Sequence, residues 1–285
     1  MITLAVPAPK DFRFHATVHS HGWYELAPFC YDEENEILSR PCRLSDAGIV
    51  TLHMYGGTVR AVMVDVEGRA ILDSRFRNEI SQIVRSIFSL DIHLEAFYAR
   101  MAKSRTYEWV DEKKAARLLA SPTVWEDLVK TLLTTNTSWA NTKKMVEKFV
   151  TIDPDAIFPT PQQVAELDPE NFRKTLGAGY RAPYLLELAE RIVSGELDVE
   201  SWRSLDSPTL YKKVVELSGF GDYSAGTMLR LLGHFDRLAI DSVARHAYAA
   251  MCEKDTVEDS EIRDYYKQFG EWQGLALWMD CMREE

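Results

Sequence analysis

Two glycines separated by one residue, Gly219 and Gly221, lie between two stretches whose apolar residues recur at helical spacing. Glycine lets the backbone turn sharply and approach a ligand where a β-carbon would collide. The helix after the turn begins near Tyr223 and Ser224. Its first backbone N–H groups and the positive end of its dipole form an arrangement that binds phosphate without a lysine. The same pattern is also typical of a plain tight turn between helices.

An aspartate follows this turn after one further helix. Asp241 stands twenty residues after Gly221, behind the apolar pair Ala239 and Ile240 and at the head of a new helical stretch. A carboxylate fixed there could stabilise positive charge that develops in a transition state, or orient and deprotonate a water molecule. An aspartate at a helix start is also a good N-cap, so a purely structural role stays open.

The elements that must position these residues fall into two parts. The first part is β-rich and predicts an antiparallel sheet with a hairpin turn at Tyr55–Thr58, followed by two helices packed on the sheet. The predicted strands are Phe12–Val18, Ile37–Arg43, Ile49–Tyr55 and Val59–Val66, and the predicted helices are Phe76–Phe88 and Leu94–Met101.

Nearly everything after Ser121 is predicted to be helical. A hydroxyl residue followed by proline indicates a helix start, and Gly195 indicates the end of a helix that begins near Ala182. The hydroxyl–proline pairs are Ser121–Pro122, Thr160–Pro161 and Ser207–Pro208. The polar stretch Lys103–Lys114 is the predicted junction. We therefore predict an α+β fold, with a β-rich domain that carries packed helices over residues 1–105 and an all-α domain over residues 106–285.

The composition narrows the class of protein. The 285 residues carry 44 acidic and 33 basic side chains, a formal charge of −11, which argues against binding nucleic acid through bulk electrostatics. Ten acids against four bases lie in Glu253–Glu285, so more than half of the imbalance is confined to the C-terminal segment. The four cysteines form no C-x-x-C pair, which disfavours a zinc site or an iron–sulfur cluster. No membrane span or signal peptide is readable, so we expect a cytoplasmic protein, associated with the nucleoid if prokaryotic.

These motifs together resemble the helix-hairpin-helix (HhH-GPD) DNA glycosylase superfamily. Its members have a hairpin of the form L-P-G-V-G and, about twenty residues later, a catalytic aspartate in a V-D-x-x-x-R context. Leu217–Gly221 and Ile240–Arg245 are similar to these two motifs, although Ser218 replaces the proline. Further similar segments are Leu128–Ala140, Leu176–Ala182 and Phe269–Ala276. The likeness covers Ser121–Glu285, and the β-rich start resembles the sheet domain of the 8-oxoguanine and bacterial alkylpurine branches.

The resemblance implies that Asp241 is the catalytic residue of an enzyme that hydrolyses the N-glycosidic bond of a base flipped out of double-stranded damaged DNA. It places Gly219, Gly221 and Ser224 at the DNA, and Thr135 and Asn136 in a loop that fills the gap in the helix. A polar Asn after a helix is equally typical of a C-cap.

Tyr223 occupies the position at which strand-cutting members carry a lysine, which implies base removal without strand cleavage. Tyr223 and Trp278 are the candidates for the base pocket, and an electron-rich ring suits a cationic alkylated purine. An aromatic residue such as Trp278 is more typical of a core than of a pocket.

The resemblance further implies that backbone carbonyls of Val215, Leu217 and Phe220 hold a structural monovalent cation, K⁺ or Na⁺, although the chemistry itself requires no cofactor. A monomer is expected. Two alternatives stay open: an 8-oxoguanine-type glycosylase, and a non-catalytic helix-hairpin-helix protein that binds damaged DNA. No P-loop, Ser-His-Asp order or metal-spaced histidines support an unrelated small-molecule enzyme.

Overall fold

A five-stranded antiparallel sheet forms the N-terminal part of the computed structural model, which describes residues 2–45, 48–57, 60–68 and 73–283. The strand order is β1-β5-β4-β3-β2. The strands are β1 (Ile2–Pro7), β2 (Cys30–Asp32), β3 (Ile37–Leu44), β4 (Gly48–Gly56) and β5 (Ala61–Glu67). The predicted strands at Ile37, Ile49 and Val59 correspond to β3, β4 and β5, whereas β1 and β2 were not predicted.

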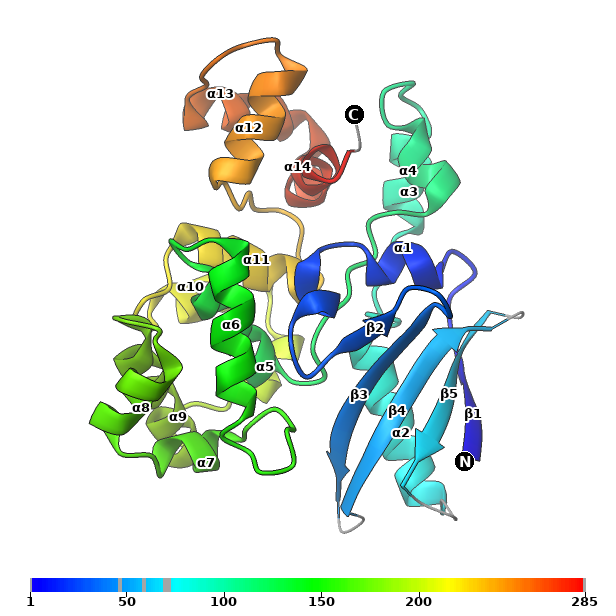
Figure 1. Cartoon of the computed structure of the whole chain (residues 1–285). Helices are drawn as coiled ribbons and strands as arrows, with labels where there is room; N and C mark the ends of the chain where they lie inside the picture. Colours follow the sequence, from blue (N-terminus) through cyan, green and yellow to red (C-terminus); the bar gives the residue numbers. More distant parts are fainter. Residues whose placement is uncertain (1, 46–47, 58–59, 69–72, 284–285) are drawn as a thin grey trace.

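One face of this sheet is apolar because its side chains alternate along each strand. Leu52 in β4 pairs with Val66 in β5, and Met54 pairs with Val64, and all four are buried. Helix α2 (Ser74–Ile87) covers this face, as Figure 1 shows. The prediction of a helix over Phe76–Phe88 is confirmed. Thr58, the last residue of the predicted turn at Tyr55–Thr58, lies outside the described residues. Val59, the first residue of the predicted strand that follows, also lies outside them.

The prediction of a strand over Phe12–Val18 is wrong. This segment contains helix α1 (Phe14–Val18), in which Phe14, Thr17 and Val18 are buried. Their spacing of three and four residues places them on one side of a helix turn. The ring of Phe14 packs against Phe88 at the end of α2, with centroids 5.3 Å apart. Contact with α2 therefore overrides the β propensity of this short segment.

The helices of the C-terminal two thirds surround α5 (Val124–Thr134), whose residues from Val124 to Leu133 are all buried. Around it lie α6 (Trp139–Val150), α7 (Pro161–Ala165), α8 (Pro169–Leu176), α9 (Arg181–Val193), the 3-10 helix η2 (Glu200–Ser204), α10 (Ser207–Val215) and α11 (Asp222–Leu231). This group and the sheet share one hydrophobic core. Figure 1 shows the helices beside the sheet rather than stacked upon it.

The predicted helix boundaries are partly confirmed. Thr160 caps α7 in a complete capping box, and α9 ends just before Gly195. Two predicted caps are wrong by one or two residues. The side chain of Thr123, not Ser121, caps α5, and that of Asp206, not Ser207, caps α10. Proline follows the hydroxyl residue in each pair, but the neighbouring side chain makes the hydrogen bond that defines the cap.

A second hydrophobic core joins segments from both ends of the chain. It contains α3 (Glu95–Met101) and α4 (Glu108–Lys113) together with α12 (Ser242–Met251), α13 (Asp259–Tyr266), the 3-10 helix η3 (Lys267–Trp272) and α14 (Gln273–Cys281). Tyr107 and Tyr266 both donate to the buried carboxylate of Asp280, at 2.7 and 2.5 Å. The predicted helix Leu94–Met101 corresponds to α3, but the prediction that it packs on the sheet is wrong. Its apolar side chains pack on the C-terminal helices instead. The division at residue 105 stays a prediction.

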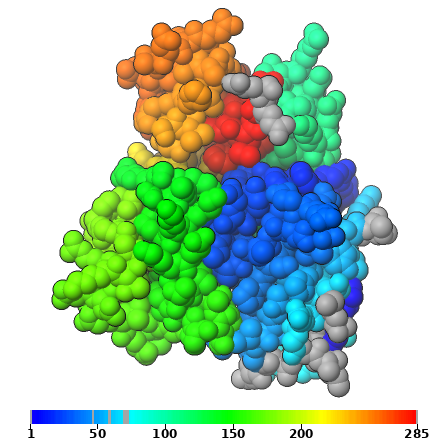
Figure 2. Space-filling view, in the orientation of Figure 1, coloured from blue at the N-terminus to red at the C-terminus, as the bar shows by residue number. Residues whose placement is uncertain are grey.

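These helices form the upper part of the molecule in Figure 1, and the space-filling surface in Figure 2 narrows between this part and the lower one. Within the described ranges, no helix has the length and apolar content that crossing a bilayer requires.

Candidate active site

A cavity of about 910 Å³ lies where the two cores meet. Its lining comes from the 3-10 helix η1 (Gly22–Glu25), the loop between α5 and α6, the start of α6, the turn between α10 and α11, α11 itself, the start of α12, and α14. Its lining includes every predicted catalytic, DNA-binding and base-pocket residue, namely Asp241, Tyr223, Trp278, Thr135, Asn136, Gly219, Gly221 and Ser224. The roles of these residues stay predictions, but the structure places them around one space.

The turn at Gly219 depends on glycine. Gly219 has a φ of +84°, a conformation that L residues rarely adopt, and a β-carbon there would lie 2.5 Å from the ring of Tyr184. The N–H of Phe220 donates to the carbonyl of Leu217 at 3.1 Å and closes the turn. Gly221 then caps α11, and a β-carbon on it would meet open space. The chain therefore enters α11 with the first N–H groups of this helix at the cavity.

The predicted cation ligands Val215, Leu217 and Phe220 do not line the cavity. Leu217 and Phe220 bury their side chains in the first core. The carbonyl of Leu217 already accepts one hydrogen bond within the turn. A carbonyl oxygen has a second lone pair, so it keeps the capacity to bind a cation.

Asp241 is the N-cap of α12, and its Oδ1 accepts from the N–H of Ala244 at 2.8 Å. The cap fixes the carboxylate at the cavity wall and uses one of its two oxygens. Arg245, one turn later, is held by Asp259 through two hydrogen bonds of 2.7 and 3.0 Å rather than by Asp241. Within the described part of the chain, Oδ2 of Asp241 has no hydrogen-bond partner, so one oxygen remains available to a ligand.

Aromatic rings form the inner wall. The half-buried ring of Tyr223 lines the cavity together with Asp241. Burial, and secondarily the charge of Asp241, raise the pKa of Tyr223. The indole N–H of Trp278 donates to the carbonyl of Ser20 at 2.9 Å, and the guanidinium of Arg230 lies 4.1 Å from its ring centroid. Trp278 is therefore both a core residue and a cavity residue, since it packs on the second core and also lines the cavity.

Thr135 and Asn136 form the exposed rim. Thr135 is the C-cap of α5, and Asn136 follows with a φ of +45°. The left-handed conformation directly after a helix is typical of a C-terminal cap. The backbone of Asn136 therefore has the conformation expected of a helix C-cap residue. Its side-chain amide donates to the hydroxyl of Tyr180 at 3.2 Å, and the guanidinium of Arg181 donates to the carbonyl of Thr135. The rim is thus braced against α9.

Several lining residues were missed from the sequence. Trp23 lines the cavity and donates to Asp127 in α5 at 2.8 Å, while Trp139 at the start of α6 donates to Glu25 in η1 at 3.2 Å. His21 is held against the carbonyl of Leu119, and burial lowers its pKa to about 3, so the ring is neutral at physiological pH. His21 and Trp23 lie in or next to η1, almost two hundred residues before the hairpin, and Trp139 lies in α6, so no local spacing connects them to it.

Comparison with known proteins identifies the family. The profile described as HhH-GPD superfamily base excision DNA repair protein matches residues 129–274. This match covers half of the chain and includes the hairpin, Asp241 and the loop at Asn136. The chain belongs to the HhH-GPD superfamily of base excision DNA repair proteins. The resemblance inferred from the motifs is confirmed.

Relatives with known names are similar over nearly the whole chain. A DNA-3-methyladenine glycosylase from Bacillus subtilis (strain 168) is 24% identical over 295 residues, which cover 96% of each chain. The structure of 3-methyladenine DNA-glycosylase from Archaeoglobus fulgidus superposes with a TM-score of 0.76 and 17% identity, covering 98% of this chain and 97% of that one. The apo structure of Clostridium acetobutylicum 8-oxoguanine glycosylase/lyase gives a TM-score of 0.73 at 17% identity, over 99% and 97%. The α+β fold, sheet included, is therefore shared with both kinds of protein.

Proposed function

We propose that this protein binds double-stranded damaged DNA, receives a flipped alkylated purine in the cavity, and hydrolyses its N-glycosidic bond with Asp241 as the catalytic carboxylate. The observation that carries this proposal is the meeting of a half-liganded carboxylate, aromatic walls and a helix-hairpin-helix turn around one cavity of about 910 Å³. This volume suits a small-molecule or base-sized ligand. The Bacillus and Archaeoglobus relatives, both named 3-methyladenine glycosylases, support the choice of an alkylated purine.

Base removal without strand cleavage is part of the proposal. A strand-cutting reaction through a Schiff base needs an amine that attacks the sugar. None of the described residues that line the cavity is a lysine, and the position in the hairpin at which strand-cutting members carry one is Tyr223. Water is then the nucleophile.

The chemistry follows from the position of the carboxylate. When the bond between the sugar carbon C1′ and the base nitrogen breaks, its electron pair leaves with the base and the sugar gains oxocarbenium character. Asp241 stabilises that positive charge, which exists mainly in the transition state. Water then adds to C1′ and loses a proton to solvent or to the same carboxylate.

DNA is held in this proposal by backbone groups more than by basic side chains. The N–H groups at the start of α11 face the phosphates, and the positive end of the helix attracts them. Thr135 and Asn136 at the rim enter the gap that the flipped base leaves. The carbonyls of Val215, Leu217 and Phe220 would hold a monovalent cation that adds positive charge beside the phosphate. This arrangement explains how a chain of formal charge −11 can bind a polyanion.

The test is Asp241→Asn. Asparagine is also a preferred N-cap, so the capping hydrogen bond from the N–H of Ala244 is retained while the charge is lost. At 4 Å and an effective dielectric of 20, a unit pair is worth about 4 kcal/mol, and each 1.4 kcal/mol is tenfold in rate. We expect base release from alkylated duplex DNA to fall by about 10²- to 10³-fold.

The matched control is Asp168→Asn. Asp168 caps α8 by accepting from Asn171 at 2.8 Å, the same bond in a helix that does not line the cavity. Its replacement should leave base release unchanged. Equal activity of the Asp241 variant and the parent would identify a protein that binds damaged DNA without catalysis.

Two further measurements test the finer parts of the proposal. Duplexes with methylated purines and with 8-oxoguanine, offered to one sample, test the lesion. Release of 8-oxoguanine alone would favour the alternative that the Clostridium structure represents. Borohydride reduction during the reaction traps a Schiff base if one forms, so a covalent adduct with DNA would show that the protein also cuts the strand.

A further inference from the structure

Among the residues that the structure describes, no hydrogen-bond acceptor lies against the guanidinium of one cation in the cavity wall, Arg230. Arg230 lies on α11, seven residues after Tyr223 and hence on the same side of that helix, and only 6% of it is exposed. Its guanidinium lies 4.1 Å from the ring centroid of Trp278. A ring covers the face of a guanidinium but does not accept from its N–H edge. No hydrogen bond or ion pair of this side chain occurs within the described residues.

The other buried cations differ in this respect. In the described part of the chain, Arg40 and Lys130 both donate to Glu126, and Arg117 donates to Asp11 and to the carbonyl of Ser89. Arg181 donates to the carbonyl of Ala178 at 3.3 Å. Leaving a buried charge without a partner is costly, and the fold avoids it at each of these positions. Arg230 is the exception, and it lies in the cavity wall.

The donors of Arg230 face the cavity. The guanidinium nitrogens of Arg230 are not fully enclosed and keep some solvent-accessible surface. Arg230 also borders a second cavity, beside Ile92 and Phe235, but this cavity is too small for a water molecule. The accessible N–H edge therefore opens on the cavity that Asp241 and Tyr223 also line. Burial lowers the pKa of Arg230, but an arginine remains charged at any physiological pH.

We propose that Arg230 donates hydrogen bonds to the acceptor edge of the flipped base, a ring nitrogen or carbonyl oxygen, and stabilises the electrons that this base receives as it leaves. The inference rests on the proposed function and deepens it, because it assigns the group that acts on the leaving base. Asp241 stabilises the sugar half of the breaking bond, and Arg230 stabilises the base half.

The charge balance determines which bases need this residue. The C1′–N bond breaks, its electron pair goes to the base, and water supplies the oxygen that bonds to C1′. A base that carries a positive charge through alkylation becomes neutral on leaving, so it departs readily. A neutral base becomes an anion until it takes up a proton from solvent. Arg230 therefore matters most for neutral bases.

The experiment compares two purines that share the carbonyl at position 6 and differ in charge. Duplexes contain hypoxanthine, which is neutral, or N7-methylguanine, which is cationic, and base release is measured under single-turnover conditions. The variant is Arg230→Met, which keeps an unbranched apolar chain against Trp278. We expect hypoxanthine release to fall about 100-fold, as for loss of one donor to a developing anion, and N7-methylguanine release to fall by less than about tenfold.

Two further variants separate this role from a structural one. Arg230→Lys keeps the charge and should restore part of the hypoxanthine activity. The matched control is Arg245→Gln, which removes a charge from the exposed rim of the same cavity, where Arg245 is paired with Asp259. It should lower release of the two bases by the same factor. An equal loss for both bases in Arg230→Met would overturn the inference.

Binding gives a readout that does not depend on turnover. In the Asp241→Asn background, Arg230→Met should weaken binding to the hypoxanthine duplex and leave binding to a duplex with a tetrahydrofuran abasic analogue unchanged. If this difference is found but the parent releases no base, the proposed function fails and the assignment of Arg230 as a base-contacting residue stands. If both duplexes bind the variant as tightly as the parent, the inference on Arg230 is wrong.

Discussion

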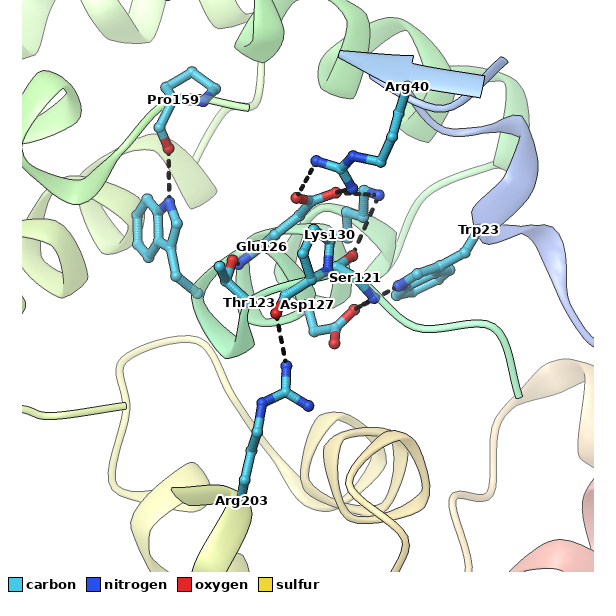
Figure 3. Close-up of polar contacts among 11 residues, drawn as sticks. Trp23, Arg40, Ser121, Thr123, Glu126, Asp127, Lys130, Pro159 and Arg203 are labelled. Atoms are coloured by element: carbon cyan, nitrogen blue, oxygen red, sulfur yellow. Dashed lines mark hydrogen bonds and ion pairs between the residues drawn. The ribbon is translucent and has the colours of Figure 1, made fainter. Parts of the chain in front are cut away.

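Replacement of Glu126 by glutamine should destabilise the protein strongly, because Glu126 joins the sheet to the central helix. Its carboxylate accepts from Arg40 of β3 at 3.2 and 3.1 Å and from Lys130 of α5 at 2.8 Å. Figure 3 shows both donors converging on it. All three side chains are at most 3% exposed. Burial alone raises the pKa of Glu126, but the two cations outweigh this effect and hold it below its usual value.

The magnitude follows from these contacts. At an effective dielectric of 20, a unit pair about 3 Å apart gains about 5 to 6 kcal/mol, most of which offsets the removal of the charges from water. Removing one member of a buried pair leaves the others unpaired, at a cost of about 3 to 5 kcal/mol. Asp127 lies next to Glu126 and its carboxyl attracts Lys130, although burial raises the pKa of this carboxyl and so weakens the compensation. We therefore expect a loss of about 3 kcal/mol at pH 7.

Urea unfolding, followed by tryptophan fluorescence and far-ultraviolet circular dichroism, measures this loss. The control is Glu170→Gln. Glu170 and Lys174 are also four residues apart on a helix with an N–O distance of 2.8 Å, but their side chains are 78% and 71% exposed. This variant should change stability by less than about 0.5 kcal/mol. A cost below about 1 kcal/mol for Glu126→Gln would refute the reasoning that burial decides the strength of this pair.

The sign of the pH dependence gives a second check. A carboxylate whose pKa is lower in the folded state stabilises the protein above its unfolded-state pKa, and this contribution is lost as the pH falls through the folded-state value. The difference in stability between the parent and Glu126→Gln should therefore be complete at pH 7 and shrink in the acid range below the ordinary glutamate pKa of 4.5.

Two further predictions concern the cavity. Burial lowers the pKa of His21 to about 3, so as the pH falls the unfolded chain takes up a proton on this residue before the folded chain does. The unfolding free energy of the parent should therefore fall by up to about 1.4 kcal/mol per pH unit between about pH 6 and 3. His21→Gln should show a shallower decline in thermal unfolding experiments across that range. Gly219→Ala should lose at least about 1 to 2 kcal/mol of unfolding free energy, because its φ is +84° and its β-carbon would meet Tyr184. Gly221→Ala should fold normally, because its β-carbon would meet open space. It should bind duplex DNA more weakly in a fluorescence anisotropy titration, because that open space is where we propose that a phosphate binds. Unweakened DNA binding by a folded Gly221 variant would contradict the phosphate assignment at the hairpin.

The sequence by itself determined what depends on neighbouring residues. Helical spacing is a local property, so most helices of the C-terminal two thirds and α2 could be predicted, as could strands β3 to β5. The hairpin and Asp241 lie within 25 residues of each other, and their motifs carry the resemblance to the family, which the family profile confirms. The segment at Phe14 shows the limit, because its β propensity is weaker than the contact of its ring with Phe88, a residue more than seventy positions away.

Only the tertiary structure decided which residues surround Asp241. His21 and Trp23 reach the cavity from the sheet end of the chain, and Trp278 reaches it from the other end, because α3, α4 and the C-terminal helices share one core. Arg230 could be read from the sequence as one more basic residue on a helix. In the part of the chain that the structure describes, its guanidinium has no acceptor. Only the packed structure shows this, because no stretch of sequence determines which side chains surround a buried group.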